Sequence, residues 1–303
     1  MQATSPTRAL IDRIETLIHE DVGRNVGPLF AATAGGLWRS AHALATDPAP
    51  RIGLLTGFYV PLAIPPAAET DGPIGADLLA AGLSRAGVPV RMMTDRPCAS
   101  GCDAALRGAG LGDLPLDIVN LNAPLEPATE TWRKAGITWA MAIERCGRTQ
   151  SGPPRNMRGV DISAHTAALD DLFLAGPWDT IAIADGGNEM GTGALPRTLM
   201  ARHVAHGDLI ACVTPASHLI MAGVSHWGCY AMLAALAILR PDWREAMLSC
   251  LDPALDLTIM QTMMTEGPAV DGVSQRQEPT IDTLDMTTHH RKLAAIQKIA
   301  ASL

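Results

Sequence analysis

The chain has 303 residues, of which 48% are hydrophobic, so it can bury a large core, and we predict a single domain over residues 1–303. The formal net charge is −8 and no basic block occurs, which argues against nucleic acid as a partner. Residues 221–239 form the longest apolar stretch, but Ser225 and His226 interrupt it, which argues against a membrane span.

The N-terminal segment is expected to be an amphipathic helix, because Ile11, Ile14 and Ile18 follow helical spacing. Asp12 and Glu15 lie within the same segment, so it does not have the apolar core of a signal peptide. Six cysteines are scattered without the spacing of a disulfide framework or a zinc site. This use of cysteine is typical of a reducing compartment, and we predict a cytoplasmic protein.

Short apolar runs, each ending in a polar or glycine-rich turn, recur along the chain and predict buried strands. In chain order these runs are "RIGLLTGFYV", "VPVRMMTD", "LDIVNLN", "GITWAMAIERCG", "DTIAIADGG" and "DLIACVT". Helical segments separate them, including "GPIGADLLAAGLSRAG", residues 227–239 and a final amphipathic helix in "MTTHHRKLAAIQKIA".

Strands that alternate with helices and are apolar on both faces predict an α/β fold. The expected architecture has three layers, α/β/α, with a mostly parallel, doubly wound sheet. In such sheets a ligand binds beyond the carboxyl ends of the strands. Polar residues that directly follow a strand are therefore candidates for a shared site.

The first candidate segment follows the first strand and runs from Thr56 to Ala76. It begins at Thr56 and Gly57 and enters a helix at "TDGPIGA", where Thr70 or Asp71 can cap the helix. A capped helix start offers free N–H groups to an anion. The connection is also long for a compact domain, which is typical of functional loops.

The second candidate segment is "AIERCGRTQSGPPRNMRGVDIS", in which Glu144 ends a strand and four arginines follow. Guanidinium groups bind carboxylate or phosphate through paired hydrogen bonds. Arg145 and Arg158, together with Asn156, are therefore predicted to contact an anionic substrate. The alternative is that the arginines pair with surface carboxylates.

The third candidate segment, "ADGGNEMGTG", places Asp185, Asn188 and Glu189 in a glycine-rich loop after a strand. The loop has no lysine, and its glycines do not fit a dinucleotide-binding motif. Two carboxylates would repel a bare phosphate, whereas carboxylate oxygens are suitable ligands for Mg²⁺ or Mn²⁺. The loop therefore predicts a divalent cation or an ammonium group.

Two later segments are less specific. In "SHWG", Ser225 is expected to be an N-cap, Trp227 to begin an apolar helix, and His226 to lie at the surface unless it is a base or a ligand. That apolar helix is expected to be core rather than a subunit interface. In residues 266–285, Asp271, Glu278 and Asp282 either complete a polar site or solvate a loop.

The motifs "ETDGPIGA", "AIERCGR", "NMRGVDIS", "ADGGNEMGTG", "SHWGCYA" and "EPTID" occur in this order. As an ordered set they resemble the D-glutamate cyclase family, from about residue 8 to the end of the chain. The resemblance implies conversion of D-glutamate to 5-oxo-D-proline with loss of water.

That reaction needs a base near the amine, an electrophile on the γ-carboxylate and help for a departing water. We predict that Glu144, Asp185 and Glu189 are catalytic and hold a divalent cation, Mg²⁺ or Mn²⁺. The choice of base between Glu144 and Glu189 stays open. The predicted substrate contacts are Thr56, Gly57, Thr70, Asp71, Arg145, Asn156, Arg158, Asn188, Ser225 and Trp227.

Two other functions fit the same residues. One is a metal-dependent phosphohydrolase, because a cation and arginines also bind a phosphate ester. The other is a non-catalytic binder of an acidic amino acid. In each case the expected partner is a small acidic molecule, and the chain can form a homo-oligomer.

Overall fold

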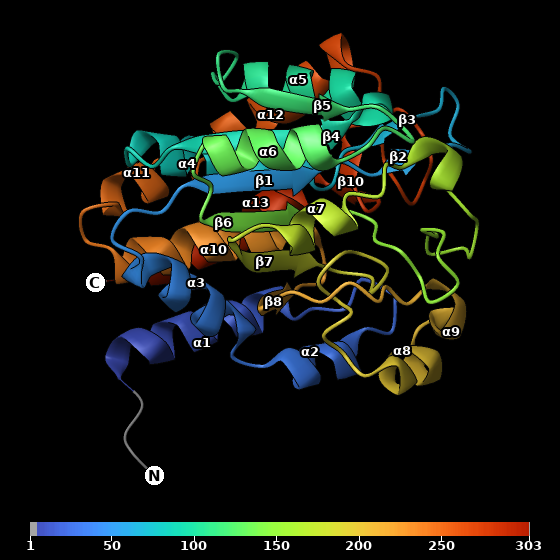
Figure 1. The fold of residues 1–303 in the computed structure, drawn as a ribbon. Coiled ribbons are helices and arrows are strands. Elements are labelled where there is room, and N and C mark those ends of the chain that lie inside the picture. Colours follow the sequence, from blue (N-terminus) through green and yellow to red (C-terminus); the bar gives the residue numbers. More distant parts are fainter. Residues whose placement is uncertain (1–4, 303) are drawn as a thin grey trace.

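A six-stranded, all-parallel sheet forms the centre of the computed structural model, which describes residues 5–302 (Figure 1). The strand order is β5-β4-β1-β6-β7-β8. The strands are β1 (Ile52–Thr56), β4 (Val90–Asp95), β5 (Leu116–Val119), β6 (Trp139–Ile143), β7 (Asp179–Ala184) and β8 (His218–Met221). Helices cover both faces of the sheet, which confirms the predicted α/β/α architecture. The predicted domain also takes in residues 1–4 and 303, which lie outside the described residues.

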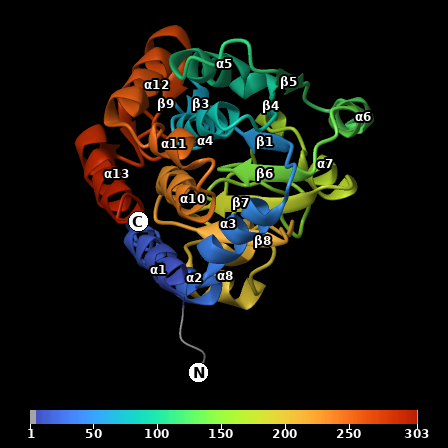
Figure 2. The same cartoon turned by 90° about the vertical axis from the view of Figure 1, so that its left-hand side faces the viewer.

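The two faces of the sheet carry different numbers of helices (Figure 2). One face is covered by two short helices, α6 (Glu126–Lys134) and α7 (Asp170–Ala175). The other is covered by a thicker layer built on α4 (Pro73–Arg85) and α10 (Ser225–Leu239). In the same layer α3 (Gly36–Thr46) packs on β8 and α5 (Ala99–Gly108) contacts β4. Further out lie α1 (Pro6–Ile18), α11 (Arg244–Leu248), α12 (Pro253–Glu266) and α13 (Met286–Ala300).

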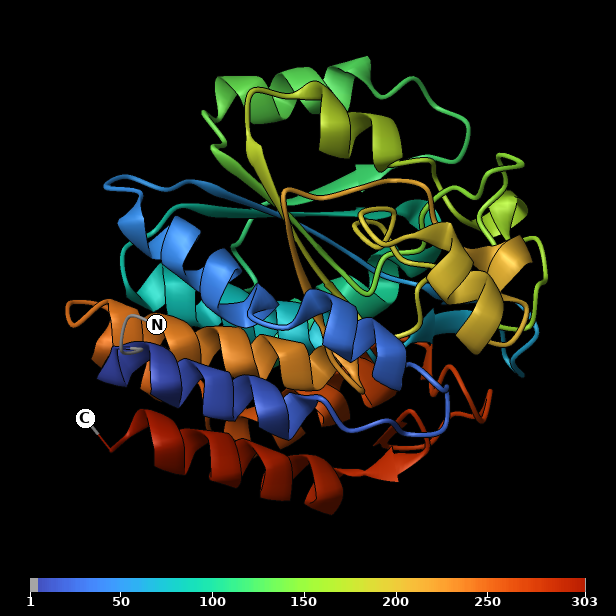
Figure 3. The same ribbon diagram turned by 90° about the horizontal axis from the view of Figure 1, so that it is seen from below.

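Helix α10 lies inside this thicker layer, because α1 and α13 pack against the side that faces away from the sheet (Figure 3). Its residues from Ser225 to Ile238 are all buried. A helix that is apolar on every side is stable in water only when it is covered all round. The prediction that this segment belongs to the core is confirmed.

The remaining elements gather mainly at the carboxyl end of the strands (Figure 1). A small sheet contains β2 (Tyr59–Val60), β3 (Ala67–Glu69) and β9 (Ala269–Val270), and a hairpin contains β10 (Thr280–Ile281) and β11 (Leu284–Asp285). The short helices are α2 (Gly27–Thr33), α8 (Arg197–His203) and α9 (Gly207–Ile210), with 3₁₀ turns at Arg96–Cys98 and Ser163–His165.

Five of the six predicted strands are confirmed, but the strand predicted at "DLIACVT" is wrong. Residues Gly207–Ile210 form α9, and Cys212 only makes an isolated bridge with Thr149. The sixth strand is β8, which pairs with β7 in parallel. Within residues 5–302, no helix has both the length and the hydropathy needed to cross a bilayer.

The order of the strands locates the binding end of the sheet. From β1 the chain adds β4 and β5 on one side, and from β6 it adds β7 and β8 on the other. The connections therefore reverse between β1 and β6, which are neighbours in the sheet. In open α/β sheets such a reversal leaves a crevice at the carboxyl ends of the two strands.

Candidate active site

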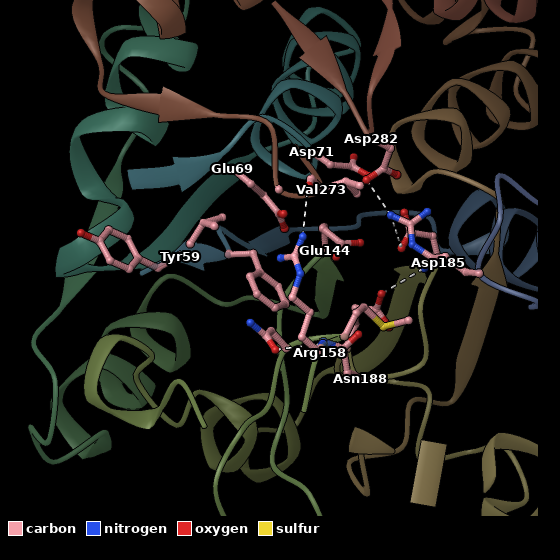
Figure 4. A pocket seen from close by; sticks show the side chains of 16 residues that line it. Tyr59, Glu69, Asp71, Glu144, Arg158, Asp185, Asn188, Val273 and Asp282 are labelled. Atoms are coloured by element: carbon pink, nitrogen blue, oxygen red, sulfur yellow. Dashed lines mark hydrogen bonds and ion pairs between the residues drawn. The ribbon is translucent and has the colours of Figure 1, made fainter. Parts of the chain in front are cut away.

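A pocket of about 210 Å³ lies at the carboxyl end of the sheet, next to this reversal (Figure 4). Pockets for drug-sized ligands enclose roughly 300–1,000 Å³, so this one suits a smaller molecule. It is lined by Arg24, Phe58, Tyr59, Val60, Glu69, Asp71, Glu144, Asn156, Met157, Arg158, Asp185, Asn188, Glu189, Gly272, Val273 and Asp282. Carboxylates outnumber guanidinium groups, so the pocket is acidic.

Three of the carboxylates converge. One oxygen each from Asp71, Glu144 and Asp185 lies within 4.8 Å of the others, and all three residues are buried. The start of α10 is aimed at them: the Ser225 N–H donates to Asp71 Oδ2 at 3.1 Å and to Asp185 Oδ2 at 3.0 Å. The Ser225 hydroxyl donates to Glu144 Oε2 at 2.6 Å. Anionic groups are stabilised at a helix N-terminus, which explains how three acids share this space.

Backbone conformation brings two of these acids together. Glu144 directly follows β6 and has a φ of +42°, which turns its side chain out of the strand direction. Gly72, which follows Asp71, has a φ of +92°. A Cβ at Gly72 would lie 2.8 Å from the Cβ of Glu144, so only glycine allows this close approach.

The carboxylates of the pocket could hold a cation, and their pKa values respond to this crowding of acids. Burial and the neighbouring carboxylates raise the pKa of Glu144 well above its ordinary value. Burial also raises the pKa of Asp185 well above its ordinary value, although the charge of Arg24 acts to lower it. Burial and Asp282 raise the pKa of Asp71 to about 6. Protons therefore partly neutralise the pocket, and a divalent cation would displace them.

Arg24 is a site residue that the sequence did not reveal. Its Nη2 lies 2.6 Å from Asp282 Oδ1 and 3.7 Å from Asp185 Oδ1, and its Nη1 donates to the Gly223 carbonyl at 3.1 Å. Burial lowers the pKa of this guanidinium, but Asp185 and Asp282 more than offset that effect and raise it well above its ordinary value. Arg24 follows α1 in a loop with no recognisable motif, so no sequence signal marked it.

Glu69 and Asp282 are two further acids of the pocket. Glu69 ends β3 and is 9% exposed, and Asp282 lies in the turn of the β10–β11 hairpin and is 8% exposed. Burial and Asp71 raise the pKa of Glu69 well above its ordinary value. Of the two uses predicted for Asp282, the structure shows the first, a place in a polar site. Glu69 was not predicted, although it is part of "ETDGPIGA".

Glu189 lines the pocket, but both of its oxygens accept hydrogen bonds from its own loop. Oε1 accepts from Gly186 N at 2.7 Å, and Oε2 accepts from Gly187 N at 2.6 Å. Its carboxylate is not in the convergent group of three, where Asp71 takes the place predicted for Glu189. Glu189 therefore fixes the glycine-rich turn that follows Asp185. Asn188 fastens the same turn, because its Nδ2 donates to the Arg155 carbonyl at 2.9 Å.

The arginine-rich segment supplies one guanidinium to the pocket. Arg158 lines it and donates from Nη2 to the Val273 carbonyl at 2.8 Å. Asn156 shapes the loop, since its Oδ1 accepts from the backbone N–H groups of Arg158 and Val160 at 3.0 Å each. The other predicted contact, Arg145, is buried and is not part of the pocket lining. It pairs with Asp95 at 2.6 Å and donates to the Gly57 carbonyl at 2.8 Å.

Several other predicted contacts support the pocket rather than line it. Thr56 and Gly57 lie beneath it, next to Gly72 and Arg145. The Thr70 hydroxyl donates to the Thr280 carbonyl at 2.7 Å. Trp227 donates from Nε1 to His289 Nδ1 at 2.8 Å. Ser225 is the first residue of α10, with Val224 as the N-cap, so it reaches the carboxylates from one position further along the helix than predicted.

His226 is not at the surface, as was expected, but fully buried. Its backbone N–H donates to Asp71 Oδ1 at 2.9 Å, and its ring Nε2 lies 3.0 Å from Asp256 Oδ1. Burial lowers the pKa of this imidazole, but Asp256 more than offsets that effect and raises it. His226 therefore links Asp71 of the pocket to Asp256 of α12.

A parallel, doubly wound α/β protein with an acidic pocket at the reversal point of its sheet is typical of enzymes that bind small ligands. A model of the D-glutamate cyclase-like C-terminal family matches residues 14–297. Human mitochondrial D-glutamate cyclase is 32% identical over 245 residues, an alignment that covers 76% of this chain. The chain spans 39% of the length of that human relative. The chain belongs to the D-glutamate cyclase-like family, which confirms the resemblance read from its motifs.

Proposed function

We propose that this protein is a D-glutamate cyclase that converts D-glutamate to 5-oxo-D-proline and water. The observation that carries the proposal is the convergence of Asp71, Glu144 and Asp185 in a small pocket that also contains Arg158. Membership of the family adds support, because the human relative is named for this activity.

The reaction joins the α-nitrogen to the γ-carboxyl carbon and expels one γ-oxygen as water. The ammonium group loses two protons, and the departing oxygen gains two, so no net proton is released. The flexible substrate must be held in a curled shape, and such positioning supplies much of the rate in intramolecular reactions. A small pocket fits that requirement.

The three convergent carboxylates fit a divalent cation such as Mg²⁺ or Mn²⁺, because they are hard oxygen donors gathered in a buried space. When bound, such a cation supplies Lewis-acid polarisation of the γ-carboxylate. Glu144 can act as the base instead: without a cation, burial and neighbouring acids raise its pKa, which makes it suited to accept a proton from the amine and pass it to the departing oxygen.

Arg158 is the guanidinium that remains for the substrate's α-carboxylate. It lines the pocket, whereas Arg145 is already paired with Asp95 and Arg24 with Asp282. Phe58, Tyr59 and Met157 also line the pocket and supply apolar surface. Apolar walls exclude water and strengthen the electrostatic interactions inside.

The proposal is tested by measuring 5-oxoproline formation from D-glutamate with Glu144→Gln, Asp185→Asn and Glu189→Gln, with and without Mn²⁺ after chelation. We expect Glu144→Gln and Asp185→Asn to lower kcat/KM by at least about a hundredfold. Glu189→Gln is expected to lower it through the displaced loop. Glu130→Gln on α6, a half-buried residue outside the pocket lining, is the matched control and should retain full activity.

Full activity in all three pocket variants would overturn the catalytic assignment. Activity that is indifferent to chelation would remove the cation from the proposal and leave the acid/base part standing. Hydrolysis of small phosphate esters without cyclisation of D-glutamate would favour a phosphohydrolase instead.

A further inference from the structure

Two buried oxygens in the pocket have no hydrogen-bond partner within the described residues. They are Oε1 of Glu69 and Oδ2 of Asp282, both in side chains that are more than nine-tenths buried. Both residues line the pocket, and Figure 4 shows their side chains directed into it. A buried acceptor without a donor costs free energy, so a ligand that donates hydrogen bonds to these two oxygens would bind favourably.

The other pocket acids already have donors. Ser225 donates to Asp71, Glu144 and Asp185. Glu189 accepts from the amides of its own glycine turn. Among the pocket residues that the structure describes, the fully buried carboxylate oxygens without a partner therefore lie on the wall formed by the end of β3 and the turn of the β10–β11 hairpin.

Neither guanidinium group of the pocket donates to these two oxygens. Arg24 pairs with the other oxygen of Asp282, Oδ1, at 2.6 Å. Arg158 donates to the Val273 carbonyl at 2.8 Å. A phosphate or carboxylate would bring only acceptors to Glu69 and Asp282, whereas an ammonium group brings three N–H donors and a positive charge.

We propose that Glu69 and Asp282 form a subsite for the α-ammonium group of an amino acid, separate from the carboxylates of Asp71, Glu144 and Asp185. The inference rests on the proposed function, because it assigns one end of the proposed substrate. An α-amino acid carries its ammonium and carboxylate on the same carbon, and Arg158 lies in the same pocket to bind that carboxylate. The γ-carboxylate then extends toward the three convergent acids.

Gly272 gives a second way to probe this subsite. A Cβ at Gly272 would lie 1.9 Å from Glu69 Oε2 and 3.1 Å from its Cδ, so alanine there forces the Glu69 carboxylate to move. Gly272→Ala leaves every charge in the pocket in place. This variant therefore tests the position of the Glu69 carboxylate without removing its charge.

The experiment compares the binding of D-glutamate and glutarate, which has the same two carboxylates but hydrogen in place of the ammonium group. Affinities are measured by calorimetry, or as KM and Ki where the protein turns over D-glutamate. We expect the wild type to prefer D-glutamate by at least about tenfold, as for a charge-assisted hydrogen bond. Glu69→Gln and Gly272→Ala should reduce this preference to less than about threefold, without weakening glutarate.

Exposed Glu126→Gln on α6 removes one carboxylate far from the pocket and should keep the wild-type preference. Thermal unfolding of each variant checks that it is folded. An unchanged preference in folded Glu69→Gln and Gly272→Ala would overturn the subsite, as would equal affinity for the two ligands, or no binding of either, in the wild type. A preserved preference without 5-oxoproline formation would overturn the proposed reaction but support the ammonium subsite.

Discussion

Asp77 is an acid that the pocket does not use. It lies in α4, fully buried, and neither carboxylate oxygen has a hydrogen-bond partner within the described residues. Burial raises its pKa well above the ordinary value. The folded protein therefore keeps this side chain protonated at pH values where the unfolded chain has lost the proton.

Asp77→Asn is expected to become more stable than the wild type as the pH rises above about 4. Above the unfolded pKa the folded state binds more protons at this position than the unfolded state, so the wild-type free energy of unfolding falls with pH. Asparagine does not titrate and lacks this dependence. Urea denaturation across the range from about pH 4 to pH 8 measures the difference.

Asp103→Asn serves as the control for that measurement, because Asp103 is an exposed acid on α5. Its stability difference from the wild type should change little over the same range. Parallel pH dependence in Asp77→Asn and the wild type would show that Asp77 is ionised in the folded protein.

At the residue scale, the sequence predicts which residue types gather at the strand ends but not where their side chains point. Asp71, Glu144 and Asp185 follow strands or start a helix, so their positions could be read from the pattern. Arg145 follows Glu144 directly, and side chains of consecutive residues point in different directions at the end of a strand. Its buried pairing with Asp95 depends on a distant strand that no local pattern reveals.

At the scale of elements, the N-terminus of α10 organises the acids. The backbone N–H of Ser225 donates hydrogen bonds to Asp71 and Asp185, whereas its hydroxyl donates to Glu144. Ser225 is the first helical residue, and Val224 before it is extended, with a φ of −143° and a ψ of 132°. Proline is compatible with the first position of a helix and with an extended residue before it.

Ser225→Pro and Ser225→Ala therefore separate the two donors. We expect Ser225→Pro to lower kcat/KM for D-glutamate more than Ser225→Ala does, because proline removes the amide shared by two carboxylates in addition to the hydroxyl, and leaves the helix intact. Steady-state kinetics measures the effect, and circular dichroism checks the helix. Equal or higher activity in Ser225→Pro would mean that the amide does not position the acids.

The wrongly predicted strand shows a limit at this scale. "DLIACVT" is apolar and ends at a polar residue, as the true strands do, but Gly207 starts a helical turn there. The true edge strand β8 has four residues and lies next to the apolar run of α10, so its boundary is hidden in the sequence. A short apolar run in a sequence is compatible with either a strand or a buried helix, so the run alone does not decide which of the two forms.

At the scale of the whole molecule, the pocket is built from segments that lie far apart in the chain, from Arg24 to Asp282. A ligand that bridges them binds only the folded protein, so it stabilises all of it. The sequence could predict the sheet and the end of it that carries the site. It could not predict that the hairpin near the C-terminus covers that end, because the packing of α13 and α10 decides this.

Mn²⁺ is expected to raise the Tm of the chelated protein. At about 100 times its Kd, a ligand contributes about 2.7 kcal/mol, which shifts the Tm of a chain of this size by a few degrees. Asp185→Asn should abolish most of the shift, and excess chelator should reverse it. Differential scanning calorimetry measures the change.

The Mn²⁺-induced shift should also shrink on acidification. Burial and Asp282 raise the pKa of Asp71 to about 6, so at about pH 5 a proton occupies the Asp71 carboxylate, and at about pH 7.5 that proton has largely left and no longer competes with the cation. A shift of the same size at both pH values, or none in the wild type at the higher pH, would contradict a cation held by these three acids.

The distribution of the pocket along the chain also matters while the protein is being made. Ribosomes build a chain from its N-terminus at about 5–20 residues per second. The last strand of the large sheet ends at Met221, so Glu144 and Asp185 are synthesised well before Asp282 and the hairpin. A nascent chain thus holds the acids of the sheet edge before the wall with Glu69 and Asp282 can form. The three acids that we propose to hold the cation therefore leave the ribosome before the hairpin, and the proposed subsite for the amine is the last part of the pocket to be synthesised in full.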